Sequence, residues 1–191
     1  MEPRQAARQE GRGAQAGGEE VSAEPRVLIP ERRLRGRVRA LARRIADDYR
    51  GRELHLIGVL HGAFVFMADL ARHLRQPLTC DFLRAASYGD ATASSGRVRF
   101  TLEPAQPVAG RHVLLVEDIV DTGLTLSAVL GRLRRRRPAS LRVCALLRKT
   151  ARAKVPVPVD YLGFDIPDHF VVGYGLDHAA RWRNLPYIGC L

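Results

Sequence analysis

The chain has 191 residues, of which 46% are hydrophobic and 27% charged, and its formal net charge is +11. This length suits one ordinary domain with a short appendage, and the hydrophobic fraction supports a real core, which excludes a wholly disordered or collagen-like protein. No stretch approaches the roughly eighteen uninterrupted apolar residues of a membrane-spanning helix.

The positive charge is concentrated in two segments. Residues 26–52 carry ten basic and three acidic residues, and residues 131–154 carry ten basic and no acidic ones. Only two of the 31 basic residues are lysines, a skew toward arginine that is typical of a GC-rich genome. Such runs are most often solvated surfaces, although they also suit phosphorylated metabolites. We therefore expect neither a nucleic-acid nor a membrane partner.

The cysteines and the N-terminal sequence indicate the cellular compartment of the protein. Cys80, Cys144 and Cys190 follow no metal or redox spacing. Cys80 and Cys144 lie in apolar runs and are expected to be buried free thiols. The N-terminus lacks the apolar centre of a secretory signal, so a reducing, cytoplasmic setting is expected. Residues 1–25 contain no Ile, Leu or aromatic residue, which predicts a disordered tail ahead of one domain spanning 26–191.

Hydrophobic periodicity predicts alternating helices and strands. After Pro30, apolar residues at steps of four, three and four predict a helix through Ile45. The predicted elements that follow are strand 54–60, helix 63–74, strands 78–83, 98–102 and 113–116, helix 124–133 and strand 141–147. This alternation predicts an α/β fold with a mostly parallel central sheet flanked by helices, its core at about 35–158.

Two further segments stand apart from this alternation. Residues 87–96 are polar and bounded by glycine, which predicts a mobile loop. Residues 159–164 and 170–174 are short strand-like runs separated by turns, and they predict a small hood made of residues 159–191.

The strongest functional signal follows the apolar strand 113–116. Glu117 and Asp118 come directly after it, and Asp121, Thr122, Gly123 and Thr125 lead into a helix. The carboxyl ends of parallel strands bind ligands, and a helix N-terminus favours phosphate. Two carboxylates beside such a loop suit vicinal hydroxyls or Mg²⁺, and ribose 5-phosphate offers both a diol and a phosphate. In the alternative interpretation, Asp121 caps the helix and the acidic pair is merely solvated.

Residues 116–123, with the sequence VEDIVDTG, resemble the phosphoribosyl-pyrophosphate signature of type I phosphoribosyltransferases. Four more blocks, residues 59–70, 87–89, 147–149 and 163–177, are similar to the hypoxanthine-guanine phosphoribosyltransferases, and the resemblance covers roughly residues 27–191. It implies the type I phosphoribosyltransferase fold with a small hood over the purine site. It also implies purine salvage: Mg²⁺-dependent transfer of the 5-phosphoribosyl group from phosphoribosyl pyrophosphate to hypoxanthine or guanine.

The resemblance assigns roles at the phosphoribosyl end. Glu117 and Asp118 are expected to hold the ribose hydroxyls, directly or through Mg²⁺, and Asp177 a second Mg²⁺ beside the pyrophosphate. The 5′-phosphate is expected on the loop formed by Asp121, Thr122, Gly123, Leu124 and Thr125. Asp121 is the family's general base or acid at the purine N7.

The pyrophosphate contacts implied by the family are the turn at His61 and Gly62, Ser87 and Tyr88 on a closing loop, and Arg183. This turn often contains a cis peptide in the family. Two residues depart from the family's pattern: position 61 commonly holds Lys or Arg, and position 124 is often polar. Because the turn acts mainly through its backbone, function is expected to survive, with a pH-sensitive pyrophosphate affinity.

At the purine end, the resemblance implies that Lys149 donates to the 6-oxo group and that Phe170 stacks on the ring. Val171 would bind the base edge through its backbone, next to Asp177. An ammonium donor favours an oxo group over the amino group of adenine. From pattern alone, Lys149 is as well explained as a surface lysine and Phe170 as a core residue.

Three other functions are compatible with parts of the sequence. The first is a regulatory member of the fold that binds RNA through residues 131–154. The second is a relative without catalytic activity, and the third is a phosphoribosyltransferase that prefers xanthine. The purine-specific groups argue against the first, and arginines near the end of a helix complement its dipole without any partner. The family's habit predicts a homodimer or homotetramer.

Overall fold

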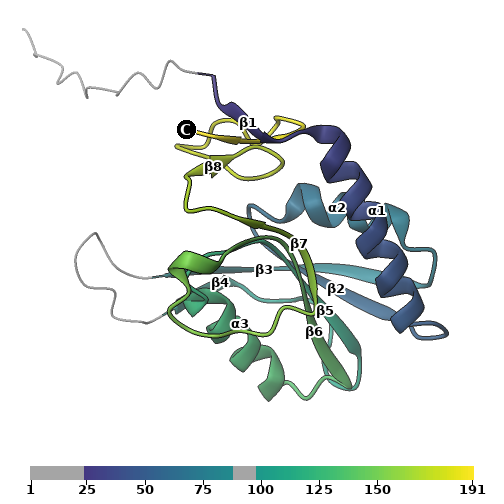
Figure 1. Cartoon of the computed structure of the whole chain (residues 1–191). Coiled ribbons are helices and arrows are strands. Elements are labelled where there is room, and N and C mark those ends of the chain that lie inside the picture. Colours follow the sequence, from purple (N-terminus) through teal and green to yellow (C-terminus); the bar gives the residue numbers. More distant parts are fainter. Residues whose placement is uncertain (1–23, 88–97) are drawn as a thin grey trace, which may run out of the picture.

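A six-stranded sheet forms the body of the computed structural model, which describes residues 24–87 and 98–191 (Figure 1). Its strands, in the order β4-β3-β2-β5-β6-β7, are Val98–Leu102, Leu78–Ser87, Leu54–Val59, His112–Val120, Ser140–Lys149 and Tyr161–Ile166. All neighbours pair in parallel except β4, which lies antiparallel to β3. The predicted α/β fold with a mostly parallel sheet is confirmed.

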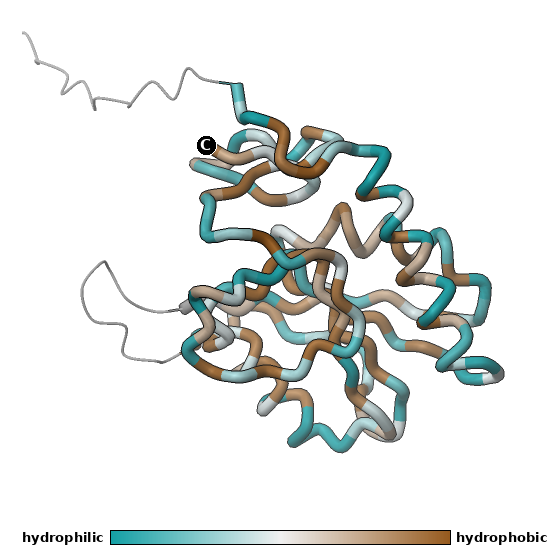
Figure 2. Tube along the Cα trace, in the orientation of Figure 1, coloured by the Kyte–Doolittle hydropathy of each residue, from teal (hydrophilic) through white to brown (hydrophobic). Residues whose placement is uncertain are grey.

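Helices cover both faces of this sheet. Helices α1 (Glu31–Asp48) and α2 (Phe64–His73) pack on one face and α3 (Leu124–Arg135) on the other (Figure 1). Successive residues of β5 therefore point into different cores: Leu114 packs with α1 and α2, and Leu115 packs with α3. Burial on both faces explains the uninterrupted apolar run Val113–Val116 in β5. Figure 2 shows brown, hydrophobic segments along the sheet and teal, hydrophilic ones at its outer turns.

The apolar stripe of α1 does what its spacing predicts. Leu34, Val38, Leu41 and Ile45 are all buried, while the arginines between them are exposed. The helix starts after Pro30, as expected, and extends three residues beyond Ile45.

A second, three-stranded antiparallel sheet forms the hood, which Figure 1 shows above the main sheet beside the C-terminus. Its strands, in the order β1-β9-β8, are Arg26–Ile29, Ile188–Cys190 and Val171–Val172. The prediction that residues 159–164 belong to the hood is wrong, because β7 pairs in parallel with β6 in the main sheet. The connection from β6 to β7 contains only the 3₁₀ turn Thr150–Arg152, so no helical periodicity announces a crossover.

The predicted tail and the predicted loop are largely outside the residues that the structure describes. Residues 1–23 and 88–97, which include most of the predicted tail and loop, lie outside the described residues.

Cys144 is buried as expected, but the prediction for Cys80 is wrong. Its thiol is exposed because β3 begins near the edge of the sheet, where neighbouring residues are only half-buried. Among the described residues, no helix is long and apolar enough to cross a membrane.

A buried polar group lies at the opposite end of the strands from the acidic pair. The Nδ1 atom of His55 is 2.8 Å from the Thr79 hydroxyl, to which Arg111 donates at 2.6 Å. The Thr79 hydroxyl can accept from Arg111 and donate its own hydrogen to Nδ1, an arrangement that suits a neutral His55 ring. Burial lowers the pKa of His55, and the cation of Arg111 lowers it further.

We predict that His55 makes the protein less stable in acid. Its folded-state pKa is lowered, so as the pH falls below the ordinary value of 6.5 the unfolded chain takes up a proton that the folded chain resists. Urea denaturation between pH 8 and 5 should show the free energy of unfolding of the wild type falling relative to that of His55→Gln. A constant difference between the two proteins across this range would contradict the prediction.

Candidate active site

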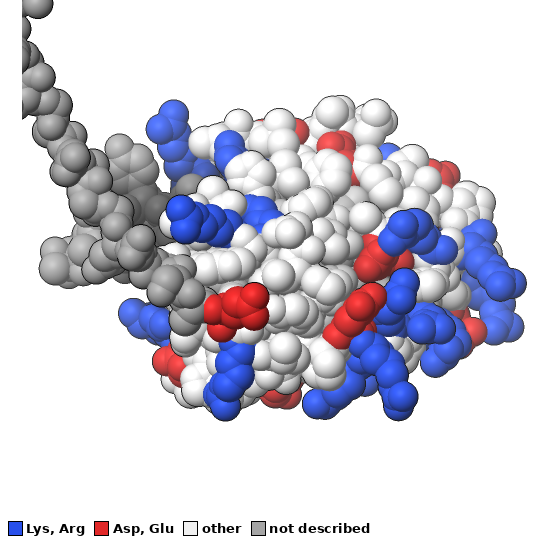
Figure 3. Space-filling model, turned by 90° about the horizontal axis from the view of Figure 1, so that it is seen from above, with Lys and Arg blue, Asp and Glu red and all other residues white. Residues whose placement is uncertain are grey.

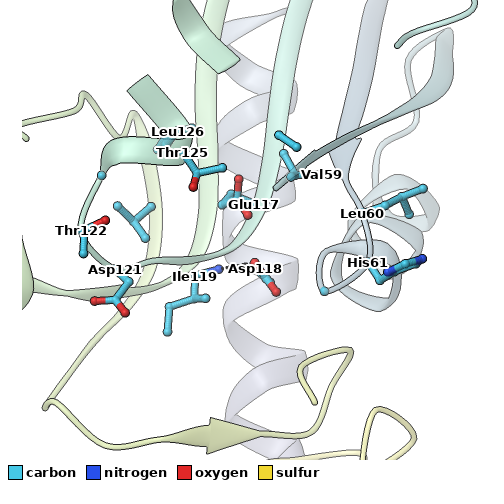
Figure 4. A pocket seen from close by; sticks show the side chains of 14 residues that line it. Val59, Leu60, His61, Glu117, Asp118, Ile119, Asp121, Thr122, Thr125 and Leu126 are labelled. Atoms are coloured by element: carbon cyan, nitrogen blue, oxygen red, sulfur yellow. Dashed lines mark hydrogen bonds between the residues drawn. The ribbon is translucent and has the colours of Figure 1, made fainter. Parts of the chain in front are cut away.

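A cavity of about 250 Å³ opens at the carboxyl ends of β2 and β5. Its lining consists of Val59, Leu60, His61, Gly62, Ala85, Glu117, Asp118, Ile119, Val120, Asp121, Thr122, Gly123, Thr125 and Leu126. Figure 4 shows Asp118 between the Leu60–His61 turn on one side and the loop of Asp121 and Thr122 on the other. This end of a parallel sheet is where the sequence predicts ligand binding.

The two carboxylates belong to β5 itself, which continues past them to Val120. Glu117 is only 8% exposed, so the interpretation of a solvated acidic pair is wrong. Burial raises the pKa of Glu117 well above its usual range, and the neighbouring Asp118 raises it further. Burial also raises the pKa of Asp118, opposed by the bond that Asp118 accepts from the Ile119 amide at 2.7 Å and by the charge of Arg183.

Within the described part of the chain, Oε2 of Glu117 has no hydrogen-bond partner. An ionisable oxygen buried without a partner is costly, and in this cavity a ligand can supply the missing partner. A cation or a pair of hydroxyls would satisfy it.

The loop after β5 presents the N-terminus of α3. Gly123 adopts a φ of 80°, and no side chain caps the helix, so the alternative in which Asp121 serves as the cap is wrong. The Thr122 hydroxyl accepts a 3.4 Å bond from the Leu124 amide, and Thr125 lines the cavity. The uncapped N–H groups of α3 and these hydroxyls suit an anion such as phosphate.

The turn after β2 is pressed between the acidic pair and the hood. The peptide between Leu60 and His61 is cis. A Cβ on Gly62 would overlap Oδ2 of Asp118, and one on Gly175 of the hood would overlap the carbonyl oxygen of Gly62. Because both positions are glycine, the turn can pack directly against Asp118 on one side and against the hood on the other.

The ring of His61 is exposed and faces an arginine of β3. Its Nε2 lies 2.7 Å from Nη2 of Arg84, a nitrogen that can only donate a hydrogen bond. The polar side chains at this turn therefore include one cation that the sequence pattern did not single out.

The hood brings a second group of predicted residues over this site. Arg183 pairs with Asp177 at 2.6 Å and donates to the Gly175 carbonyl at 2.6 Å. Asp177 also accepts a 2.8 Å bond from the Ala180 amide. Because Arg183 lowers the pKa of Asp118, the charges of the hood and of β5 act on one another.

The predicted purine contacts are brought together less completely. Phe170 is 53% exposed and makes an edge contact with His178 at 5.1 Å, so it is not a core residue. Val171 is buried in β8. Of the predicted loop residues, Ser87 ends β3, and Tyr88 lies outside the described residues.

Lys149, at the end of β6, is only 6% exposed, so a surface lysine is excluded. Its Nζ lies 3.2 Å from Oδ1 of Asp168. Lys149 and Asp121 line a second cavity of about 250 Å³ that adjoins the first. Arg152 lies 3.3 Å from Asp121, a contact that no sequence pattern indicated beyond the position of Arg152 in an arginine-rich segment.

Comparison with known proteins decides the family. Residues 31–179 match the family model of the phosphoribosyl transferase domain. The chain belongs to the phosphoribosyltransferase family. A hypoxanthine phosphoribosyltransferase of Salmonella typhimurium is 46% identical over 165 residues, covering 85% of this chain and 93% of that protein. A hypoxanthine-guanine phosphoribosyltransferase of Mycobacterium avium is 48% identical over 171 residues, covering 86% and 84%.

The fold agrees with that of the family. A crystal structure of a hypoxanthine-guanine phosphoribosyltransferase from Bacillus anthracis superimposes with a TM-score of 0.84 at 43% identity, covering 88% of this chain and 99% of that one. The predicted type I phosphoribosyltransferase fold, with its mostly parallel central sheet flanked by helices, is therefore confirmed.

The donor set at the site suits magnesium. Glu117, Asp118 and Asp177 offer carboxylate oxygens, the ligands that this hard cation prefers. Among the residues that the structure describes, no three potential ligands are gathered into one cluster. Mg²⁺ is usually held by one or two carboxylates together with water and substrate oxygens.

We predict that Gly123→Ala destabilises the fold. The φ of 80° is strained for alanine, and the added Cβ would overlap the Val155 carbonyl oxygen, so a loss of roughly 1–3 kcal/mol is expected in urea denaturation. Gly131→Ala in α3 is the matched control. Because open space surrounds Gly131, alanine there should stabilise by about 0.5–1 kcal/mol. Equal effects at the two positions would contradict this account.

Proposed function

We propose that the chain catalyses the Mg²⁺-dependent transfer of the 5-phosphoribosyl group from phosphoribosyl pyrophosphate to hypoxanthine or guanine, forming IMP or GMP and pyrophosphate. The observation that carries the proposal is the buried acidic pair between an uncapped helix N-terminus and a glycine turn. The names of the similar proteins from Salmonella typhimurium and Mycobacterium avium support this choice of base.

In this proposal, different residues bind the ribose, the 5′-phosphate and the pyrophosphate of the donor molecule. Glu117 and Asp118 bind the ribose hydroxyls or a Mg²⁺ ion. The loop of Asp121, Thr122, Gly123, Leu124 and Thr125 receives the 5′-phosphate at the N-terminus of α3. The pyrophosphate lies against the backbone of His61 and Gly62, near Ser87 and Tyr88.

The hood completes the pyrophosphate site. Arg183 is assigned to pyrophosphate oxygens, and its partner Asp177 is assigned as a carboxylate ligand for a second Mg²⁺. When bound, Mg²⁺ supplies positive charge that stabilises the leaving pyrophosphate.

The transfer breaks the bond from C1 of the ribose to the pyrophosphate oxygen, which leaves with its electron pair. A purine ring nitrogen forms the new bond to C1 through an oxocarbenium-like transition state. Asp121 lies between the loop and the second cavity, where a carboxylate can accept the proton released at the purine N7. Positioning of the two substrates supplies much of the rate.

Base selection is assigned to the second cavity. Lys149 is a buried donor that suits the 6-oxo group of hypoxanthine and guanine and would leave the amino group of adenine unpaired. The exposed ring of Phe170 is available to stack on the purine, and the backbone of Val171 and the side chain of Asp177 lie beside it in the hood.

The RNA-binding alternative loses its main argument because much of the basic charge is already paired. Arg132 and Arg136 both contact Glu103, Arg142 contacts Asp48, and Arg148 contacts Asp165. On the face seen in Figure 3, most of the surface is uncharged, and the basic side chains gather mainly on one side, with carboxylates among them. We also propose, from the resemblance, that the protein is a cytoplasmic homodimer or homotetramer.

We predict that purified protein with phosphoribosyl pyrophosphate and Mg²⁺ converts hypoxanthine or guanine, and neither adenine nor uracil, to its nucleotide. A chelator should abolish the reaction. Asp121→Asn should lower kcat by about 10²–10⁴-fold, the usual contribution of general acid–base catalysis. Folded wild-type protein that is inactive with every base, xanthine included, would overturn the proposed function.

A further inference from the structure

The segment that follows β6, residues 150–157, runs along the phosphate loop; we refer to it as the strap. The amides of Lys154 and Val155 both donate to the carbonyl oxygen of Thr122, at 3.0 and 3.1 Å. The carbonyl of Val155 occupies the space where a side chain on Gly123 would lie. The strap is therefore fixed to the loop by backbone contacts.

The strap places Arg152 beside Asp121. Nε of Arg152 forms an ion pair with Oδ1 of Asp121 at 3.3 Å, and this buried oxygen accepts no hydrogen bond among the described residues. Nη1 of the same guanidinium lies 3.7 Å from Oδ1 of Asp168. The planar guanidinium thus faces two carboxylates at once, a geometry that the point charge of lysine matches less well.

Asp168 connects this arrangement to the purine end of the site, because it is also the partner of Lys149 at 3.2 Å. Four side chains of alternating charge follow one another in space: Lys149, Asp168, Arg152 and Asp121. The first was assigned to the 6-oxo group of the base and the last to N7, so the two ends of the purine site share one network.

We propose that Arg152 is a positioning residue for Asp121. It holds one carboxylate oxygen in place and leaves the other directed at the purine, while Asp168 anchors the guanidinium. The inference rests on the proposed function, because it takes Asp121 as the proton acceptor. It adds a residue to that site that the sequence blocks leave unassigned.

This role makes a specific kinetic prediction. Arg152→Gln frees the Asp121 carboxylate to rotate away from the purine, and misplacement of a catalytic group is expected to lower kcat about tenfold. The KM for phosphoribosyl pyrophosphate should change by less than about twofold, since the backbone of the strap still supports the loop. Arg152→Lys should recover part of kcat.

The decisive experiment measures kcat and KM for the wild type, Arg152→Gln, Asp121→Asn and the double variant, with Arg134→Gln as control. Arg134 is exposed on α3 and undergoes the same substitution. If Arg152 acts through Asp121, its replacement has little further effect on kcat in the Asp121→Asn background. Urea denaturation of each variant reports on folding.

The outcomes separate the two claims. A tenfold loss in Arg152→Gln that disappears in the Asp121→Asn background, with Arg134→Gln unchanged, supports the inference. An unchanged kcat in Arg152→Gln, or the same fold loss in both backgrounds, would overturn it while leaving the proposed function intact. An inactive wild type would overturn the proposed function, and the inference with it.

Discussion

The site depends on two adjacent carboxylates buried at the end of the central strand. A parallel strand with helices on both faces is the driest place in such a fold, and β5 carries Glu117 into it without a matching cation among the described residues. Burial raises the pKa of both carboxyls, which means that holding them there in charged form lowers the free energy of unfolding. A ligand that brings hydroxyls or Mg²⁺ offsets this loss of stability by binding to the carboxylates.

The surrounding elements follow from that constraint. Gly62 has no side chain because Asp118 fills the space, and Gly175 lets the hood close over the same turn. The hood contributes Arg183, whose charge reaches Asp118, and the strap contributes Arg152, whose charge reaches Asp121. Arginines on two segments far away in the sequence thus act on Asp118 and Asp121, whereas Glu117 has no cation partner among the described residues.

Local patterns predicted much of this structure, and long-range contacts explain what they missed. The period of α1 and the apolar run of β5 report burial directly, so both elements were predictable. Strand β7 was assigned to the hood because a crossover without a helix leaves no periodic signal. The importance of Arg152 depends on the strap folding back onto the loop, which no spacing in the sequence reveals.

The measurement that tests the central claim most directly is the thermal and urea stability of wild type and Glu117→Gln, with and without phosphoribosyl pyrophosphate and Mg²⁺. Without ligand, the raised pKa of Glu117 predicts that the variant is the more stable, by a margin that grows as the pH rises above 4.5. With ligand, the wild type should gain stability and the variant little. A wild type that is the more stable without ligand at every pH would contradict the account.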